Sequence, residues 1–128
     1  MEFASFFLSV RPSEQFLMTN QTMLEGKLPD LAIMQLRASA GEACGLLKSM
    51  ANEDRLLLLC HLIDHERNVS ELEAATGIRQ PTLSQQLGVL RDEGLVSTRR
   101  EGKYVYYTLA NPAVIRVMHT LHGLFCAT

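Results

Sequence analysis

One stretch, VSELEAATGIRQPTLSQQLGVLRDEGLV (residues 69–96), constrains the fold more than any other, because three backbone signals follow one another within it. Ser70 and Glu73 have the spacing of a capping box, which predicts the start of a short helix. Gly77 predicts the end of that helix, since glycine readily adopts the left-handed conformation of a C-terminal cap. Pro81 predicts the first turn of a second helix. Two short helices joined by a turn that contains glycine indicate a helix-turn-helix.

The segment that follows, LVSTRREGKYVYYTL (residues 95–109), adds a hairpin to this motif. The second helix is expected to continue to about Glu93 and to end at Gly94. Two runs of β-prone residues then stand on either side of a turn at Glu101 and Gly102. A hairpin directly after a helix-turn-helix predicts a winged helix-turn-helix, a mainly α fold with a small β-hairpin wing.

Three further helices are predicted around the motif. Apolar residues recur at helical spacing over Leu31–Lys48, although two glycines weaken the pattern. Asn52 is a good N-cap for a helix that runs to about His65, and Asn111 precedes a last helix. The first and last of these helices have apolar faces that the motif does not use, so we expect them to form a dimer surface.

A chain of 128 residues has the length of one compact domain. We expect that domain over residues 30–128. Residues 1–29 show no sustained period and are predicted to be a flexible tail. No uncharged apolar run reaches about 18 residues, and the N-terminus lacks the basic start of a signal peptide. A cytoplasmic protein without membrane contact is therefore expected.

Positive charge is concentrated in one part of the chain. Residues 1–78 contain 6 basic and 11 acidic side chains, residues 79–103 contain 5 and 3, and residues 104–128 contain 1 and none. A local basic patch on a chain of net charge −2 indicates contact with DNA rather than general adhesion to polyanions. One such module covers too little DNA for high specificity, so we expect a homodimer that reads two half-sites of operator DNA.

The second helix of the motif has an apolar side and a polar side. Leu83, Leu87 and Leu90 lie within about 60° of one another at a helical rotation of about 100° per residue, so they form a buried stripe. The opposite side offers hydroxyl and amide groups to base edges, and nearby cations can contact phosphates. The residues predicted to contact DNA are Arg79, Gln80, Thr82, Ser84, Gln85, Gln86, Arg91, Arg99, Arg100 and Lys103.

Three stretches, LLKSMANEDRLLLLCHL, VSELEAATGIRQPTLSQQLGVLRDEGLV and TRREGKYVYYTL, resemble the ArsR/SmtB family of winged-helix repressors. The resemblance covers about residues 44–126. It implies a homodimer that binds operator DNA and, in the best-known branches, releases it when metal ions bind. The branch that responds to arsenic, cadmium and lead carries a Cys-x-Cys pair on the first helix of the motif. The corresponding VSELEAATG contains no cysteine, so that branch does not fit.

Two cysteines favour another branch of the family, that of BigR, SqrR and HlyU. Cys60 stands late in the second helix and Cys126 near the end of the last helix, and this separation of 66 positions is similar to that of the branch. The resemblance implies that persulfide or polysulfide joins the two thiols through several sulfur atoms and lowers DNA affinity. It also implies regulated genes of sulfide detoxification and no cofactor. Taken singly, a cysteine is usually a small buried apolar residue, and Cys44 is assigned such a packing role.

The sequence is also compatible with other functions. His119 and His122 share a helix face and could bind zinc as in the zinc-responsive branch, but the upstream Asp-x-His element of that branch is absent from this helix. A redox-modulated activator or anti-repressor of virulence genes, as in HlyU, would have the same fold. A thiol enzyme such as a sulfurtransferase is not expected, because no cysteine precedes an anion-binding loop and no nucleophilic constellation is recognisable.

Overall fold

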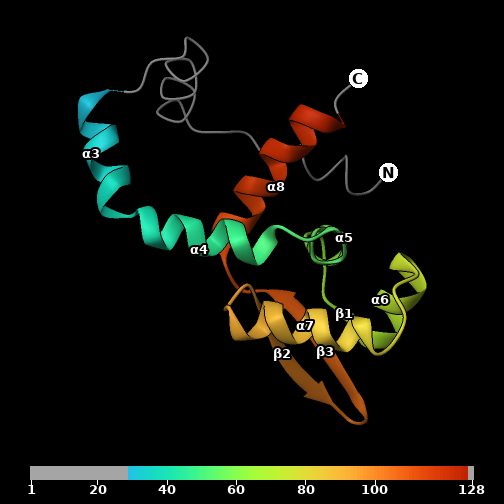
Figure 1. Ribbon diagram of the computed structural model, residues 1–128. Coiled ribbons are helices and arrows are strands. Elements are labelled where there is room, and N and C mark those ends of the chain that lie inside the picture. The colour runs from blue at the N-terminus through green and yellow to red at the C-terminus, as the bar shows by residue number, and fades with distance from the viewer. Residues whose placement is uncertain (1–28, 127–128) are drawn as a thin grey trace.

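The computed structural model describes residues 29–126 (Figure 1). The predicted N-terminal tail lies almost wholly outside these residues. The helices of the described part are α3 (Asp30–Ala38), α4 (Ala40–Met50), α5 (Glu53–Leu62), α6 (Val69–Thr76), α7 (Thr82–Asp92) and α8 (Pro112–Phe125). The strands are β1 (Arg67–Asn68), β2 (Val96–Glu101) and β3 (Tyr104–Leu109). This confirms the predicted fold, a mainly helical protein with a small β wing.

The helix-turn-helix consists of α6 and α7, and its first cap differs from the predicted one. Asn68, and not Ser70, caps α6: the Asn68 side chain accepts from the Glu71 N–H at 2.9 Å, and Glu71 returns the bond to the Asn68 N–H. The reason is that Asn68 ends β1 in an extended conformation, where an N-cap residue belongs. The predicted stop at Gly77 is confirmed by its positive φ of 75°.

The wing is one strand larger than predicted. Strands β2 and β3 form the expected antiparallel hairpin, in which Glu101 faces Tyr104, so the two loop residues are Gly102 and Lys103. The predicted turn therefore lay one residue too early. The two-residue strand β1 adds to the other edge of β3, which gives the order β1–β3–β2. In Figure 1 the hairpin projects from the end of the molecule opposite to the C-terminus of α8.

The long helix predicted over residues 31–48 is interrupted. It divides into α3 and α4 at Ser39, whose φ of −107° and ψ of 9° leave the helical region. The Ser39 N–H is shared between the carbonyls of Gln35 and Leu36, as is common where a helix ends. No residue of α3 is buried, so tertiary packing does not hold the two segments in one line.

Helix α5 begins as predicted and ends earlier. The Asn52 side chain accepts from the Arg55 N–H at 3.1 Å, which confirms the N-cap, while the helix ends at Leu62 rather than near His65. Helix α8 also begins as predicted, with Asn111 accepting from the Ala113 N–H.

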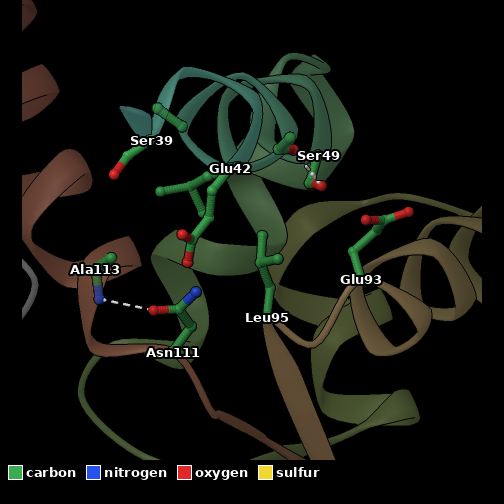
Figure 2. A pocket seen from close by; sticks show the side chains of 10 residues that line it. Ser39, Glu42, Ser49, Glu93, Leu95, Asn111 and Ala113 are labelled. Atoms are coloured by element: carbon green, nitrogen blue, oxygen red, sulfur yellow. Dashed lines mark hydrogen bonds between the residues drawn. The ribbon is translucent and has the colours of Figure 1, made fainter. Parts of the chain in front are cut away.

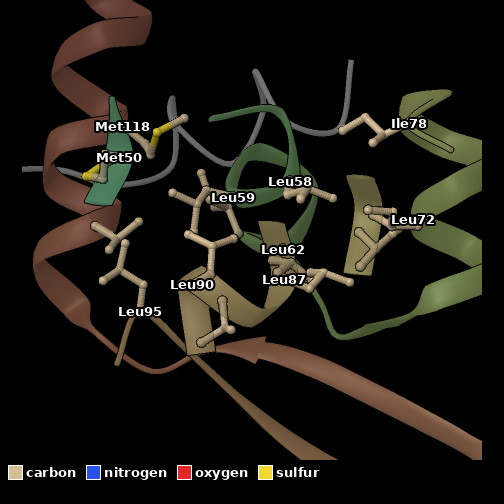
Figure 3. Packing of buried hydrophobic residues seen from close by; sticks show 14 residues of the cluster. Met50, Leu58, Leu59, Leu62, Leu72, Ile78, Leu87, Leu90, Leu95 and Met118 are labelled. Atoms are coloured by element: carbon tan, nitrogen blue, oxygen red, sulfur yellow. The ribbon is translucent and has the colours of Figure 1, made fainter. Parts of the chain in front are cut away.

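The core lies where α5, α6, α7 and α8 meet above the sheet (Figure 3). The predicted stripe of α7 is buried, with exposed fractions of 0%, 1% and 0% for Leu83, Leu87 and Leu90. Leu58 and Leu59 of α5 pack against this stripe. The core thus fixes the side of α7 that faces the protein, and leaves the other side outward. Among the described helices, none is long and apolar enough to cross a membrane.

Apolar side chains remain exposed on the helices that flank the core. The clearest are on α3 and at the end of α8, where Phe125 is 80% exposed. The exposed large apolar residues of these helices and of α4 are Leu31, Ile33, Met34, Leu36, Leu47, Leu124 and Phe125.

Candidate functional site

The outward face of α7 presents the polar groups expected there. Ser84 and Gln85 are exposed, whereas Thr82 and Gln86 are half-buried at the edges of the face. Because the buried stripe holds the helix against the core, these four side chains keep a fixed relation to the rest of the protein. Short hydroxyl and amide groups on one rigid face suit hydrogen bonding to base edges and phosphates.

Two of the predicted amides already bond within the protein. The Gln80 side chain accepts from the Ser84 N–H at 3.1 Å, which satisfies one of the free amides at the start of α7. The Gln86 side chain accepts from the Arg55 guanidinium at 2.8 Å. Gln80 therefore shapes the N-terminus of α7, the candidate recognition helix, and Gln86 joins this helix to α5.

Arg55 was not predicted as a functional residue, yet it joins three helices. Its Nε donates to the Ser49 carbonyl at 2.6 Å, and its Nη2 donates to the Lys48 carbonyl at 3.2 Å. These carbonyls belong to the last turn of α4, where the Lys48 carbonyl also accepts from the N–H of the C-cap residue Ala51 at 3.3 Å. The third contact reaches Gln86, 31 positions away in the chain. No local pattern signals a contact at that separation.

Arg99 on the wing is also engaged within the protein. Its Nε donates to Glu66 at 2.8 Å, its Nη2 donates to the second oxygen of the same carboxylate, and its Nη1 donates to Glu101 at 2.8 Å. The guanidinium carbon lies 4.6 Å from the centre of the Tyr106 ring. The hydrogen bonds that Arg99 donates to Glu66 lower the pKa of Glu66 and, together with the bond to Glu101, raise the pKa of Arg99. These contacts fix the wing to the segment between α5 and β1.

The other predicted cations are exposed on the surface around α7 and the wing. The Arg91 guanidinium lies 3.9 Å from the Asp92 carboxylate, a weak pair between two exposed side chains. The Lys103 ammonium lies 5.3 Å from the centre of the Tyr104 ring at the tip of the hairpin. Arg79 and Arg100 are exposed as well. These side chains are accessible to a phosphate backbone.

Cys60 and Cys126 line one cavity, although they stand far apart in the chain. The cavity has a volume of about 220 Å³ and lies between α5 and α8. Its lining residues are Leu56, Cys60, Met118, Leu121, His122, Phe125 and Cys126. Cys60 is half-buried, Cys126 is exposed, and both thiols are free. The predicted pair is therefore brought together in an apolar setting.

Burial changes the acidity of Cys60. The pKa of the thiol is raised from 9.0 to about 11, mainly by burial and to a smaller extent by the nearby Cys126. A buried thiol gives up its proton reluctantly because the thiolate loses its hydration. Cys60 is therefore almost entirely protonated at neutral pH. Cys44, by contrast, is exposed on α4 and is not a lining residue of this cavity, so its predicted packing role is not supported by burial.

The histidines proposed as a zinc pair lie on α8. His119 is half-buried, and His122 lines the cysteine cavity. Within residues 29–126, no three side chains of His, Cys, Asp or Glu gather closely enough to hold a metal ion. Within the described residues, His119 and His122 therefore have no third ligand that would complete a zinc site.

A larger cavity, of about 490 Å³, lies between α4, the end of α7 and the start of α8 (Figure 2). Glu42 and Glu93 stand on opposite walls of it, and Asn111 at its floor caps α8. None of the predicted DNA contacts or sulfur-reactive cysteines is among its described lining residues. The candidate site consequently comprises the outward face of α7, the wing and the cysteine cavity.

The known proteins that this chain resembles are bacterial transcriptional regulators. The sequence pattern of the arsR family of bacterial regulatory proteins matches residues 52–98, which include α5, the helix-turn-helix and the start of the wing. The chain is 48% identical over 115 residues to a biofilm growth-associated repressor of Agrobacterium fabrum, covering 86% of this chain and 96% of that protein. It is 43% identical over 94 residues to the transcriptional activator HlyU of Vibrio cholerae, covering 73% and 87%.

Solved structures agree with these sequence relatives. The transcriptional repressor BigR from Xylella fastidiosa is similar with a TM-score of 0.72 and 43% identity, over 74% of this chain and 97% of that one. Reduced HlyU from Vibrio cholerae is similar with a TM-score of 0.67 and 43% identity, over 72% and 97%. The similarity thus extends through nearly the whole length of each relative.

Proposed function

Because the chain belongs to the arsR family of bacterial regulatory proteins, we propose that it is a DNA-binding transcriptional repressor whose grip on operator DNA weakens when Cys60 and Cys126 react with persulfide or polysulfide. It acts in the cytoplasm as a homodimer on genes of sulfide detoxification. The names of its relatives support DNA regulation, and they include both repressors and an activator.

One observation supports the sensing step above all. Cys60 of α5 and Cys126 at the end of α8 line the same apolar cavity of about 220 Å³. This volume is several times the roughly 30 Å³ that a water molecule occupies, so it accommodates a short sulfur chain between the thiols. A direct disulfide requires Cα atoms within about 7 Å, whereas an inserted sulfur atom relaxes that requirement.

The reaction needs no oxidant besides the polysulfide. The Cys126 thiolate, at the exposed side of the cavity, attacks an inner sulfur of the polysulfide, breaks one S–S bond and releases a shorter hydropolysulfide anion. The Cys60 thiolate then attacks the inserted sulfur next to Cys126 Sγ and releases hydrosulfide. Two thiols lose their protons to water, the polysulfide is reduced, and a trisulfide joins the two residues.

Two routes lead from the cavity to the DNA-binding surface. Arg55 stands five residues before Cys60 on α5 and bonds Gln86 of the recognition helix. At the other end of α5, Arg67 of β1 donates to the His61 carbonyl at 2.7 Å, and β1 pairs with β3 of the wing. A bridge that pulls α5 toward α8 therefore displaces both surfaces that contact DNA. A coupling of about 1–3 kcal/mol corresponds to a 5- to 150-fold loss of affinity.

On the DNA, side chains divide into two groups. Thr82, Ser84, Gln85 and Gln86 contact base edges and nearby phosphates from the outward face of α7. Exposed cations contact the phosphate backbone and make the affinity depend on salt. These cations are Arg79, Arg91, Arg100 and Lys103. Gln80 and Arg99 act indirectly, because their contacts within the protein hold the start of α7 and the wing in place.

Intact-mass spectrometry together with a DNA-binding assay tests this function. Operator DNA is first selected from a random double-stranded library with the reduced protein. Treatment with inorganic polysulfide should then add sulfur and remove two hydrogens, and should release the DNA. Cys126→Ser should form no bridge and keep its DNA after treatment. Cys44→Ser is the matched control, since its thiol is outside the cavity, and should behave as the unchanged protein.

Two results would contradict the proposal. A reduced protein that selects no DNA sequence would remove the regulatory function itself. Quantitative bridging without any change in DNA binding would leave a DNA-binding protein but exclude sulfur sensing.

A further inference from the structure

The Arg55 guanidinium determines which groups Gln86 presents. Arginine carries only N–H donors, so the atom of Gln86 that faces it at 2.8 Å is the carbonyl oxygen Oε1. The same guanidinium is fixed from behind by the Ser49 and Lys48 carbonyls of α4. Three hydrogen bonds on one partly buried, planar group hold its orientation, and therefore that of the Gln86 amide.

An amide held in this way has fewer ways to accept a hydrogen bond from DNA. A free glutamine contacts adenine with two bonds, accepting from N6 through its oxygen and donating to N7 through its nitrogen. In this protein Arg55 takes one of the two lone pairs of the Gln86 oxygen and fixes where the second one points, whereas Nε2 keeps two hydrogens that can donate. Guanine offers two acceptors, N7 and O6, on its major-groove edge. An amide whose oxygen is held by Arg55 therefore matches guanine, which needs only donors, better than adenine, which needs a donor and an acceptor.

This inference rests on the proposed DNA-binding function. We propose that Arg55 is a specificity-determining positioning residue: by engaging the Gln86 oxygen it favours donation by Gln86, so that α7 prefers guanine to adenine at the base that Gln86 faces. Arg55 does this from α5, without itself contacting a base. Gln86 supports this role by its place on α7, half-buried at the edge of the outward face beside the exposed Gln85.

Two substitutions change the hydrogen-bonding pattern in opposite ways. Gln86→Glu keeps an acceptor for Arg55 but has no donor, and a carboxylate accepts from cytosine N4, so the preferred base should change from guanine to cytosine. Arg55→Met releases the Gln86 oxygen, so the preferred base should change from guanine toward adenine. The discrimination lost in each case is about 5- to 150-fold, the range of one good bidentate base contact.

The experiment is selection of bound sequences from a random double-stranded DNA library by the full-length reduced protein and its variants. Gln86→Ala should abolish preference at one position of each half-site, and adding Arg55→Met to it should change nothing more at that position. A merely structural Arg55 would weaken binding to all sequences alike and leave the base preference unchanged.

Thermal unfolding of each variant keeps the outcome interpretable. If Arg55→Met does not fold, Gln86→Glu still decides the matter, because it retains the contact between α5 and α7. Wild-type preference in a folded Gln86→Glu protein at every position of the half-site would overturn the inference. Failure of the unchanged protein to select any sequence would instead overturn the proposed DNA-binding function.

Discussion

The raised pKa of Cys60 predicts how the reactivity of this thiol changes with pH. Burial, with a smaller contribution from the nearby Cys126, raises the pKa of this thiol from 9.0 to about 11. Since each pKa unit is a factor of ten, the thiolate fraction of Cys60 at neutral pH is about 100-fold smaller than that of an ordinary thiol. Only the thiolate is alkylated, so the rate of Cys60 alkylation should fall by a similar factor.

The assay is a pH series of iodoacetamide labelling, read for each cysteine by peptide mass spectrometry. The Cys60 rate in the folded protein should rise until about pH 11, while the same residue in denaturant should level off near pH 9. Exposed Cys44 is labelled in the same tube and reports the activity of the reagent. In Cys126→Ser the Cys60 pKa should fall somewhat but stay above 9.0, because burial is the larger cause.

The same pKa has a consequence for stability. Folding favours the neutral thiol, so the contribution of Cys60 is fully present below pH 9 and is lost as pH rises toward 11. Unfolding free energy should therefore decline over this interval, and less so in Cys60→Ser. Equal labelling rates of Cys60 at neutral pH in folded and denatured protein would show that folding does not raise the pKa of this thiol.

Three further predictions concern the fold. Leu58→Ala should lower the unfolding free energy by about 2–5 kcal/mol, because Leu58 is fully buried. Leu57 belongs to the same leucine run but is 46% exposed, so Leu57→Ala should change the unfolding free energy by less than about 0.5 kcal/mol. Parallel urea titrations compare the two variants. Asn68→Ala should cost about 1 kcal/mol through loss of the α6 cap, and Ser70→Ala should cost almost nothing; the reverse order in the same titrations would restore the cap predicted from sequence. The hydrogen bond from Arg99 lowers the pKa of Glu66 below 4.5 in the folded protein. The contact of Glu66 with Arg99 should therefore hold the wing fully above pH 4.5, and should weaken as the pH falls through the pKa of Glu66 in the folded protein. Hydrogen exchange of the β2 amides measures that weakening, and Glu66→Gln should show the weakened state already at neutral pH.

Local signals in the sequence predicted most of the fold. Gly77 and Gly94 both adopt positive φ, of 75° and 77°, and each ends a helix of the predicted motif. Asn52 and Asn111 cap the helices that were predicted to follow them. These features depend on a few adjacent residues, and helix caps of this kind are recognisable without tertiary information.

The errors arose where tertiary contacts decide between local alternatives. Both Asn68 and Ser70 precede a glutamate by three residues, and only the pairing of β1 with β3 places the cap at Asn68. Ser39 interrupts a helix whose first half, α3, has no buried residue. The sequence pattern could not distinguish these outcomes.

The candidate site was predictable in its residue types but not in its internal bonds. The spacing of Cys60 and Cys126 predicted their pairing only through a family resemblance, and the structure places both at one cavity. The contacts of Arg55 with Gln86 and of Arg99 with Glu66 span 31 and 33 positions, and no periodicity predicts such pairs. The bond to Glu66 is the reason why the proposed function gives Arg99, predicted to contact DNA, an indirect role.

Sulfur sensing is tested most directly by the dissociation constant for the selected operator, measured by fluorescence anisotropy on purified bridged protein and on the same sample after reduction. The bridged form should have a dissociation constant about 5- to 150-fold higher, with full recovery on reduction. Equal dissociation constants for the two forms, with the bridge between Cys60 and Cys126 verified by peptide mass spectrometry, would contradict sulfur sensing.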